Sequence, residues 1–288
     1  MTGPVHSGVL EITDLLWSFD ESGERLPIRR DAAAEVLLSH GQRRAARIVR
    51  RMAVGGGELD PVAVDALGLR VHRELQRLGE ELQLGRRVAE LVAELVGALP
   101  PGPVRLVDVG CGLGHVLRAI AARGDLPSVE LVGVDLNPVL VDEARRLAAL
   151  EGLGCTFVAG SAFEPGLAIA DGARTIVVPT ALMHHLGPDA LAGFLSAQDR
   201  SGVAAFAHWD IAPCGWSTMG AWIFHQARMR EPVSRHDGVL SARRAHPART
   251  LLDAARAGAP AYDCQVREGG RWHPRALDVL RPLVGIRR

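Results

Sequence analysis

Residues 104–115 read VRLVDVGCGLGH, and this stretch indicates how the chain around it folds. An apolar run ends in Asp108, and glycines follow at positions 110, 112 and 114. Such a run is typical of a buried strand, and glycine directly behind it lets the backbone turn tightly and lets a ligand approach where a Cβ would collide. The pattern predicts a strand followed by a glycine-rich turn. Taken alone, it fits a ligand site and a tight turn without a ligand equally well.

The chain beyond residue 100 alternates short β-rich runs with amphipathic stretches. Strands are predicted at 104–109, 129–135, 155–160, 173–179 and 202–210, with helices between them. A less regular part follows, with helices near 216–230 and 248–257, a loop over 231–247, and strands at 261–266 and 283–287. Strands that alternate with helices imply right-handed crossovers and a parallel sheet covered on both faces. We therefore predict an α/β fold with a doubly wound, mostly parallel sheet.

The first hundred residues have a different character. Alanine, leucine and arginine dominate 31–53, GGGELDP interrupts the pattern at 55–61, and apolar residues then return at three- and four-residue spacing. This periodicity predicts helices, and the PPGP cluster at 100–103 predicts a boundary. We expect a helical N-terminal extension or cap over residues 1–100 and a core domain over residues 101–288. The extension is expected to contribute to the acceptor pocket.

Composition excludes several classes of function. Thirty-three basic residues balance 33 acidic ones, which disfavours a nucleic-acid binder that relies on a strongly basic surface. The four cysteines are scattered without a CxxC pair, so neither a metal knuckle nor a disulfide framework is indicated. No apolar run reaches the roughly 20 residues of a membrane span, and the first residues do not resemble a signal peptide. We expect a cytoplasmic protein with no membrane, nucleic-acid or metal partner.

A second acidic residue, Asp135, ends the next predicted strand, VELVGVD. In a doubly wound sheet, ligands bind at the carboxyl ends of the strands, and a carboxylate at this position can accept both hydroxyls of a ribose. A nucleoside-containing ligand is therefore expected at the glycine-rich turn.

Four motifs together resemble those of the class I S-adenosylmethionine-dependent methyltransferases of the small-molecule type. LVDVGCGLGH, GVDLNP, CTFVAGSAFEP and TIVVPTALMHHL occur in the family's order between residues 104 and 186. The HHL element is close to that of small-molecule methyltransferases. The resemblance implies a Rossmann-like, seven-stranded sheet with a reversed last strand, and S-adenosylmethionine as the cofactor.

The resemblance also implies a role for each matching residue. Asp108 would anchor the methionine amino group, the glycines would line the methionine and ribose, and Asp135 would take the ribose hydroxyls. Leu136 would pack on adenine, whose edge Ser161, Ala162 and Phe163 would border. Ser161 stands at or next to a position that often holds aspartate in this family. The predicted cofactor-binding set is Asp108, Gly110, Cys111, Gly112, Gly114, Asp135, Leu136, Ser161, Ala162, Phe163 and Thr180.

Histidines are the candidates for handling a proton of the methyl acceptor, because the pKa of histidine lies near neutrality. The predicted catalytic set is His185, His184, Asp210, His225 and His236. A hydrogen-bonded structural role is the alternative for each histidine, and the HHL match favours His185. His208 shares a strand face with Asp210, and packing beneath the site is its alternative role.

Absent motifs narrow the class of methyl acceptor to a small molecule or a peptide. No [DN]PP[YF] element follows the fourth predicted strand, and the proline–cysteine pair of cytosine-C5 methyltransferases is missing there. The leading hypothesis is O-, N- or C-methylation of a small molecule, with specialised metabolism as one setting. A nicotinamide-dependent oxidoreductase and a non-catalytic cofactor-binding protein of the same fold remain as alternatives.

Two groups of arginines are candidate sites for an anionic partner. One is a run on a predicted helix, comprising Arg43, Arg44, Arg47, Arg50 and Arg51. It is either a solvated face paired with nearby acids or a site for an anionic substrate or carrier protein. Arg243 and Arg244 stand in the part of the chain that shapes acceptor specificity in the family.

Overall fold

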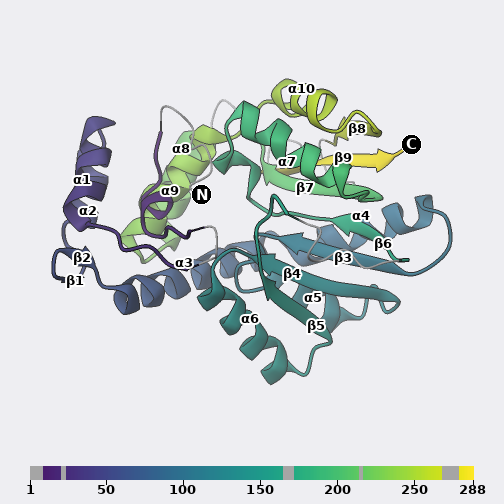
Figure 1. Ribbon diagram of the computed structural model, residues 1–288, viewed down its shortest axis with the longest axis horizontal. Coiled ribbons are helices and arrows are strands. Elements are labelled where there is room, and N and C mark those ends of the chain that lie inside the picture. The colour runs from purple at the N-terminus through teal and green to yellow at the C-terminus, as the bar shows by residue number, and fades with distance from the viewer. Residues whose placement is uncertain (1–8, 21–23, 165–171, 214–216, 268–278) are drawn as a thin grey trace. The chain divides into compact units, whose positions relative to one another are not determined.

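The computed structural model describes residues 9–20, 24–164, 172–213, 217–267 and 279–288 (Figure 1). The chain divides into two compact units, each assembled from separate segments. Unit 1 comprises Met1–Glu74, His184–Gly187 and Pro213–Ala245. Unit 2 comprises Leu75–Met183, Pro188–Ala212 and His246–Arg288.

Unit 2 is built on a seven-stranded sheet with the order β5-β4-β3-β6-β7-β9-β8. Neighbouring strands from β5 to β7 are parallel, and β9 runs antiparallel to both β7 and β8. The predicted fold class, including the reversed last strand, is therefore confirmed. The strands are β3 (Val104–Val109), β4 (Val129–Asp135), β5 (Cys155–Ala159), β6 (Arg174–Val177), β7 (Ala205–Ile211), β8 (Tyr262–Val266) and β9 (Leu280–Arg287).

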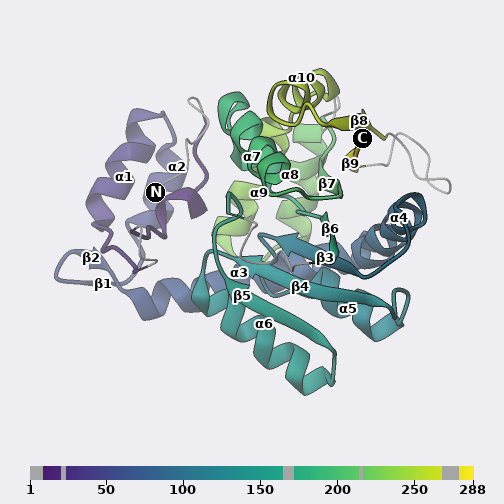
Figure 2. The same cartoon turned by 45° about the vertical axis from the view of Figure 1, so that its right-hand side comes forward.

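Helices cover both faces of this sheet (Figures 1 and 2). They are α4 (Leu84–Ala98), α5 (His115–Arg123), α6 (Pro138–Glu151), α7 (Pro188–Arg200) and α10 (Ala248–Gly258). Apolar residues of α4, α5 and α6 share one core cluster with the strands, whereas α7 packs against α10 on the other side of the sheet. Because β3 is covered on both sides, its residues are almost all buried, which explains why its sequence is a continuous apolar run.

The strand order reverses beside β3. From β3 the chain moves outward through β4 to β5, and it then returns to place β6 on the opposite side of β3. The connections leaving β3 and β6 therefore diverge at the carboxyl edge of the sheet, and this is where doubly wound folds bind their ligands.

Unit 1 is mainly helical. Its elements are η1 (Thr13–Leu15), α1 (Arg30–Ser39), α2 (Arg43–Val49), the two-stranded hairpin β1 (Val54–Gly55) and β2 (Glu58–Leu59), most of α3 (Pro61–Glu81), α8 (Ser217–Arg228) and α9 (Pro232–Arg244). Leu16, Leu37 and Val49 are completely buried in its core, which also takes Val233 of α9. Segments far apart in the sequence thus share one apolar core.

Two local predictions need correction. The helical pattern over 31–53 is divided into α1 and α2, because Gly41 takes a left-handed conformation with φ 73°. The loop predicted over 231–247 is wrong, because residues 232–244 form α9. Pro232 occupies the first turn of α9, where proline's fixed φ favours a helix and its missing N–H costs nothing.

The division into domains 1–100 and 101–288 remains a prediction. The two compact units have other boundaries, because each combines several separate segments of the chain. Helix α4 precedes residue 100 but belongs to unit 2, since Val88, Val92 and Leu95 are buried in the core cluster with the strands. Within the described residues, no helix is both long and apolar enough to cross a membrane. Of the four cysteines, Cys214 lies outside the described residues.

Candidate cofactor site and histidine cluster

The glycine-rich turn is joined to the end of the neighbouring strand in unit 2. Val109 at the end of β3 is in register with Val134 of β4, and the N–H groups of Gly110 and Cys111 both donate to the Val134 carbonyl, at 2.7 and 3.1 Å. The next pair of strands aligns Asp135 with Ala159, directly before the loop that carries Ser161. The register thus brings three of the four sequence motifs to one edge of the sheet.

Glycine is required in this turn for two reasons. Gly110, Gly112 and Gly114 have φ values of 72°, 54° and 68°, which side-chain-bearing residues rarely adopt. Gly114 also lies directly before α5, and a Cβ there would stand 2.2 Å from the ring of Phe157. The turn therefore brings backbone N–H groups and the start of a helix to the carboxyl edge of the sheet.

Backbone groups hold the carboxylate of Asp135 in place. Its Oδ2 accepts the N–H of Gly112 at 2.8 Å, and its Oδ1 accepts the N–H of Asn137 at 2.9 Å. The side chain is only partly buried, and each carboxylate oxygen can accept more than one hydrogen bond. Asp135 is therefore a fixed acceptor that can take the two hydroxyls of a ribose.

Asp108, in the neighbouring strand β3, is a buried carboxylate without a partner. Its exposed fraction is 1%, and among the described residues neither of its oxygens has a hydrogen-bond partner. Burial raises its pKa well above the ordinary value, and the negative charge of Asp135 raises it further. A buried unpaired carboxylate is costly unless a cationic group compensates it. The methionine amino group of S-adenosylmethionine is such a cation, so these residues fit the predicted cofactor.

The other predicted cofactor residues offer less polar chemistry. Leu136 is 48% exposed, and Phe163 meets Phe194 edge-on with ring centroids 5.7 Å apart. The Ser161 hydroxyl accepts the N–H of Phe163 at 3.2 Å. Cys111 packs in the core, so a ligand would meet its backbone. Ala162 is partly buried, and Thr180 forms a β-bridge with Trp209.

Unit 1 contains a largely buried group of charged side chains and histidines, here called the histidine–carboxylate cluster, formed by Glu11, Asp14, His184, His185 and Arg244. Nδ1 of His185 lies 3.4 Å from Asp14 and 3.8 Å from Glu11. Arg244 pairs with Asp14, and its Nη1 is 3.4 Å from Glu11. The rings of His184 and His185 are 4.3 Å apart. The cluster joins the N-terminal segment, η3 (Met183–His185) and α9.

The electrostatics of the cluster change the protonation expected for His185. Burial by itself would lower its pKa, but the charges of Glu11 and Asp14 raise the pKa to about 9. His185 therefore carries a proton at neutral pH, unlike a free histidine. Burial raises the pKa of Glu11, whereas hydrogen bonds from His185 and Arg244 outweigh burial at Asp14 and lower its pKa.

The same cluster has the composition of a cation site. One ligand atom each from Glu11, His184 and His185 lies within 4.8 Å of the others. In the observed arrangement, however, Arg244 lies beside the Glu11 carboxylate, and the proton on His185 would have to leave before a metal could bind. The arrangement is thus an ion-pair network, and the absence of a metal remains a prediction.

The remaining catalytic candidates lie elsewhere. His236 contacts Asp237 at 2.8 Å, and Asp237 in turn accepts the backbone N–H groups of Ile12 and Thr13. His225 packs against Gly238, and burial lowers its pKa. Both side chains belong to unit 1, and a catalytic role for either histidine remains a prediction.

Asp210 belongs to unit 2, where its Oδ1 accepts the N–H of Ile211 at 2.6 Å. His208, on the same strand, is completely buried, with its ring stacked 4.5 Å from that of Phe206. Its Nε2 lies 3.0 Å from Gln198, and burial lowers its pKa to about 3. His208 thus packs within the fold, as its alternative role predicted.

Sequence reasoning missed Glu11 and Asp14 as members of the cluster. The signal was present, because both acids interrupt the apolar stretch VLEITDLLW at residues 9–17. An acid inside an apolar run is expected to have a buried partner. The partners of Asp14 are His185 and Arg244, which lie more than 150 residues away in the sequence, so the sequence pattern did not identify them.

Comparisons with known proteins agree with this geometry. Residues 106–201 match the family described as a methyltransferase domain. The solved structure of the CurJ carbon methyltransferase superposes with a TM-score of 0.58 and 14% identity, covering 90% of this chain and 67% of that chain. Unit 2 therefore has the fold of the class I methyltransferases. Residues 106–201 therefore match a methyltransferase domain within this fold.

Two curated relatives match over short stretches. 24-Methylenesterol C-methyltransferase 2 of Oryza sativa subsp. japonica is 38% identical over 94 residues, 32% of this chain and 22% of the rice protein. Ribosomal RNA large subunit methyltransferase F of Aeromonas salmonicida is 41% identical over 69 residues, 24% of this chain and 21% of that protein. The matches span about a fifth of each relative, and the two names differ in acceptor.

Proposed function

We propose that this protein transfers a methyl group from S-adenosylmethionine to a small-molecule acceptor. The observation that carries the proposal is the pair of carboxylates, Asp108 and Asp135. Asp108 is buried without a partner, and Asp135 is held by backbone N–H groups. Together they suit a ligand with a cationic amino group and a ribose. A dinucleotide would bring a pyrophosphate to the glycine turn, where Asp108 would repel it.

The protein's part in such a reaction is mainly positional. The cofactor supplies an activated methyl group on a sulfonium, so the chain has to hold the reactants in line, exclude water and deal with the acceptor's proton. The register of β3, β4 and β5 would hold the cofactor in place for transfer, because it keeps both carboxylates and the glycine turn at one edge of the sheet.

We assign the acceptor's proton chemistry to His185. Its Nδ1 faces the carboxylates of Glu11 and Asp14, and its Nε2 has no hydrogen-bond partner among the described residues. Because the ring is protonated at neutral pH, Nε2 can donate a hydrogen bond to an acceptor oxygen and favour its anionic, nucleophilic form. Glu11, Asp14 and Arg244 act through His185 as positioning residues.

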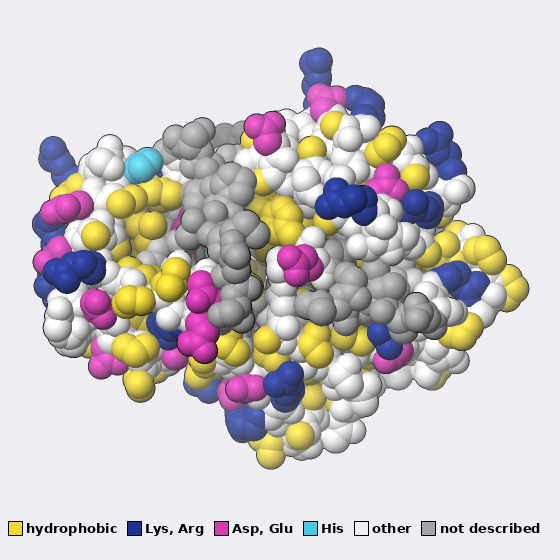
Figure 3. Space-filling model, in the orientation of Figure 1, with side chains coloured by type: hydrophobic (Ala, Val, Ile, Leu, Met, Phe, Trp, Pro, Cys, Tyr) yellow, Lys and Arg dark blue, Asp and Glu magenta, His cyan; other side chains and the backbone are white. Residues whose placement is uncertain are grey.

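A small acceptor is supported by the distribution of charge. Basic and acidic residues are equal in number, and on the face shown in Figure 3 the two signs are interspersed. A nucleic-acid substrate would be favoured by a continuous basic field. The sterol methyltransferase among the relatives agrees with a small acceptor, and the ribosomal RNA methyltransferase makes RNA the second class to test.

The experiment is to measure formation of S-adenosylhomocysteine with three acceptor pools: a small-molecule extract, total RNA and a protein fraction. We expect turnover with the small-molecule pool and loss of that turnover in Asp135→Ala. Activity should fall as pH rises through about 9, and His185→Gln should remove this fall. Turnover with RNA alone would overturn the acceptor class. Binding of S-adenosylmethionine without turnover in any pool would favour the non-catalytic alternative.

A further inference from the structure

Unit 1 contains a cavity lined by arginines that the proposed reaction does not use. It has a volume of about 270 Å³. Its lining consists of Arg44, Arg47, Ile48, Arg51, Pro232 and Arg235. Four of these six residues are arginines, so the cavity concentrates positive charge.

The cavity follows from the spacing of the arginine run. Arg44, Arg47 and Arg51 are separated by three and four residues, which places them along one stripe of α2 and the turn that follows it. Helix α9 packs against α2 and contributes Arg235, whose Nε donates to the carbonyl of Met229 at 2.6 Å. That bond fixes Arg235 and leaves the donors at the end of its guanidinium available.

These charges are not neutralised within the described part of the chain. The guanidinium groups of Arg44, Arg47 and Arg51 have neither an ion pair nor a hydrogen bond there. All three side chains are solvent-exposed, as a solvated face requires, but the pairing with nearby acids that this interpretation of the run included is not found for them among the described residues. Like charges gathered without counterions destabilise the fold, and a bound anion would relieve that cost.

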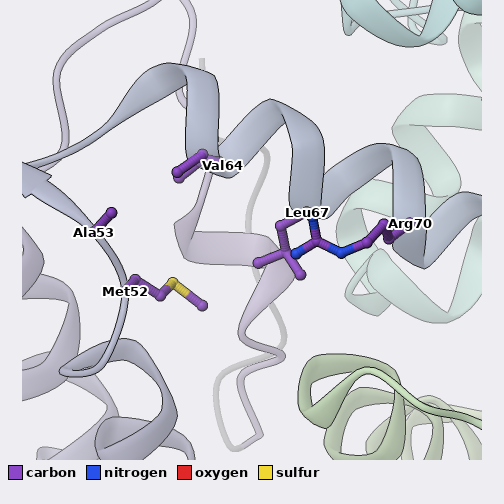
Figure 4. A pocket seen from close by; sticks show the side chains of 6 residues that line it. Met52, Ala53, Val64, Leu67 and Arg70 are labelled. Carbon is purple, nitrogen blue, oxygen red and sulfur yellow. The ribbon is translucent and has the colours of Figure 1, made fainter.

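A neighbouring cavity in unit 1 provides a contrast (Figure 4). It has a volume of about 150 Å³ and is lined mainly by apolar side chains, including Met52, Val64 and Leu67. Its one arginine, Arg70, is already paired with Glu231 at 2.7 Å. Of these two cavities, only the arginine-lined one is thus lined by described arginines that have no acidic partner.

The number of donors selects among anions. A carboxylate has two oxygens and one negative charge, so it would leave most of the guanidinium donors unused. A phosphate monoester has three terminal oxygens and nearly two charges, and arginine binds phosphate through paired, planar N–H groups. Ile48 and Pro232 add apolar surface for the group that carries the phosphate.

We propose that this cavity binds a phosphate monoester, through Arg44, Arg47, Arg51 and Arg235. The proposal concerns binding in unit 1 and does not depend on methyl transfer.

Calorimetric titration at fixed physiological ionic strength tests the proposal, with phenyl phosphate, inorganic phosphate and benzoate as probes. We expect phenyl phosphate to bind in a saturable manner and more tightly than the other two. Arg47→Gln should weaken its binding by about tenfold or more, because charge-assisted hydrogen bonds are lost. Arg43→Gln and Arg50→Gln are matched controls, because both residues belong to the same run but do not line the cavity.

Three outcomes would overturn the proposal. The first is the absence of saturable phenyl phosphate binding to the wild-type protein. The second is benzoate or inorganic phosphate binding as tightly as phenyl phosphate. The third is an equal loss of affinity in Arg43→Gln and Arg47→Gln, which would reveal a general effect of surface charge. A thermal unfolding temperature at or above that of the wild type, for each variant without ligand, shows that a lost affinity comes from the cavity and not from a damaged fold.

Discussion

At the scale of single residues, the candidate cofactor site depends on two acidic residues with opposite surroundings. Asp135 is tied to two backbone N–H groups and remains partly exposed. Asp108 is buried, and within the described residues nothing compensates its charge. One carboxylate is therefore held in position before a ligand arrives, whereas the other would gain a counter-charge from a cationic ligand.

Asp135→Ala should weaken binding of S-adenosylmethionine and S-adenosylhomocysteine alike, because both carry the same ribose. Hydrogen bonds to a charged group contribute roughly 1.5–3 kcal/mol each, so the loss should be at least about tenfold in Kd. Calorimetric titration of both ligands measures it. Wild-type affinity in the variant for both ligands would show that the ribose assignment is wrong.

Asp108→Asn should separate stability from binding. Without ligand the variant should be at least as stable as the wild type, because the amide avoids the cost of a buried charge, roughly 1–3 kcal/mol. The increase in Tm that S-adenosylhomocysteine produces should become smaller, because the amino group loses its counter-charge. Thermal unfolding with and without ligand measures both effects. A less stable variant that binds normally would contradict the role of Asp108.

At the scale of elements, the turn between β3 and α5 is limited by space as well as by conformation. Gly114 has φ 68°, and the ring of Phe157 from β5 occupies the place that a Cβ would need. The helix start and the neighbouring strand are therefore packed closely enough that glycine alone fits between them.

Gly114→Ala should destabilise the protein by about 2–4 kcal/mol, since strain at positive φ adds to the overlap with Phe157. Gly124→Ala is the matched control: it lies at the other end of α5 with φ 67°, and no atom lies within 4 Å of the place that a Cβ would take there. The control should cost only about 1 kcal/mol. Denaturant unfolding of both variants makes the comparison, and equal losses would show that the contact with Phe157 contributes nothing.

At the scale of the whole molecule, each compact unit draws on distant parts of the chain. In unit 1 the histidine–carboxylate cluster connects the segment with Glu11 and Asp14 to His185 and to Arg244 of α9. The stability of unit 1 is therefore sensitive to the protonation of His185. The charged or titratable groups that face His185 or its partners are Glu11, Asp14, His184, Asp237 and Arg244.

The raised pKa of His185 predicts the direction of the pH dependence. The pKa of His185 is about 9 in the folded chain, against the ordinary value of 6.5 expected in the unfolded chain. The stabilisation that protonated His185 contributes to the fold is therefore complete below pH 6.5 and is lost as pH rises through about 9. Since the side chain is 33% exposed, solvent screening should reduce the loss to about 1–2 kcal/mol, or a few degrees in Tm. Thermal unfolding between these pH values should show the fall in the wild type. A fall of the same size in His185→Gln would exclude His185 as its source.

Local patterns were sufficient for the parallel strands and the glycine turn of unit 2, whereas the reversed last strand was expected from the family resemblance. Buried parallel strands are continuous apolar runs, and a glycine turn followed by an acid one strand later is a local signature. The strands, their parallel direction and the position of Asp108 and Asp135 near one edge of the sheet were therefore predictable. Helix α9 was not predicted, because residues 231–247 are polar and the helix has no strong apolar stripe. Its only local signal is Pro232, which is favoured in the first turn of a helix.

The sequence by itself determined the sheet, the glycine turn and the acidic residues suited to the cofactor, because hydrophobic periodicity and backbone requirements act over short distances. Only the tertiary structure decided that Glu11 and Asp14 meet His185 and Arg244, and that Arg235 closes a cavity with the arginines of α2. Protonation and counter-charge depend on distances between groups, and contacts across more than 150 residues leave no periodic trace in a sequence.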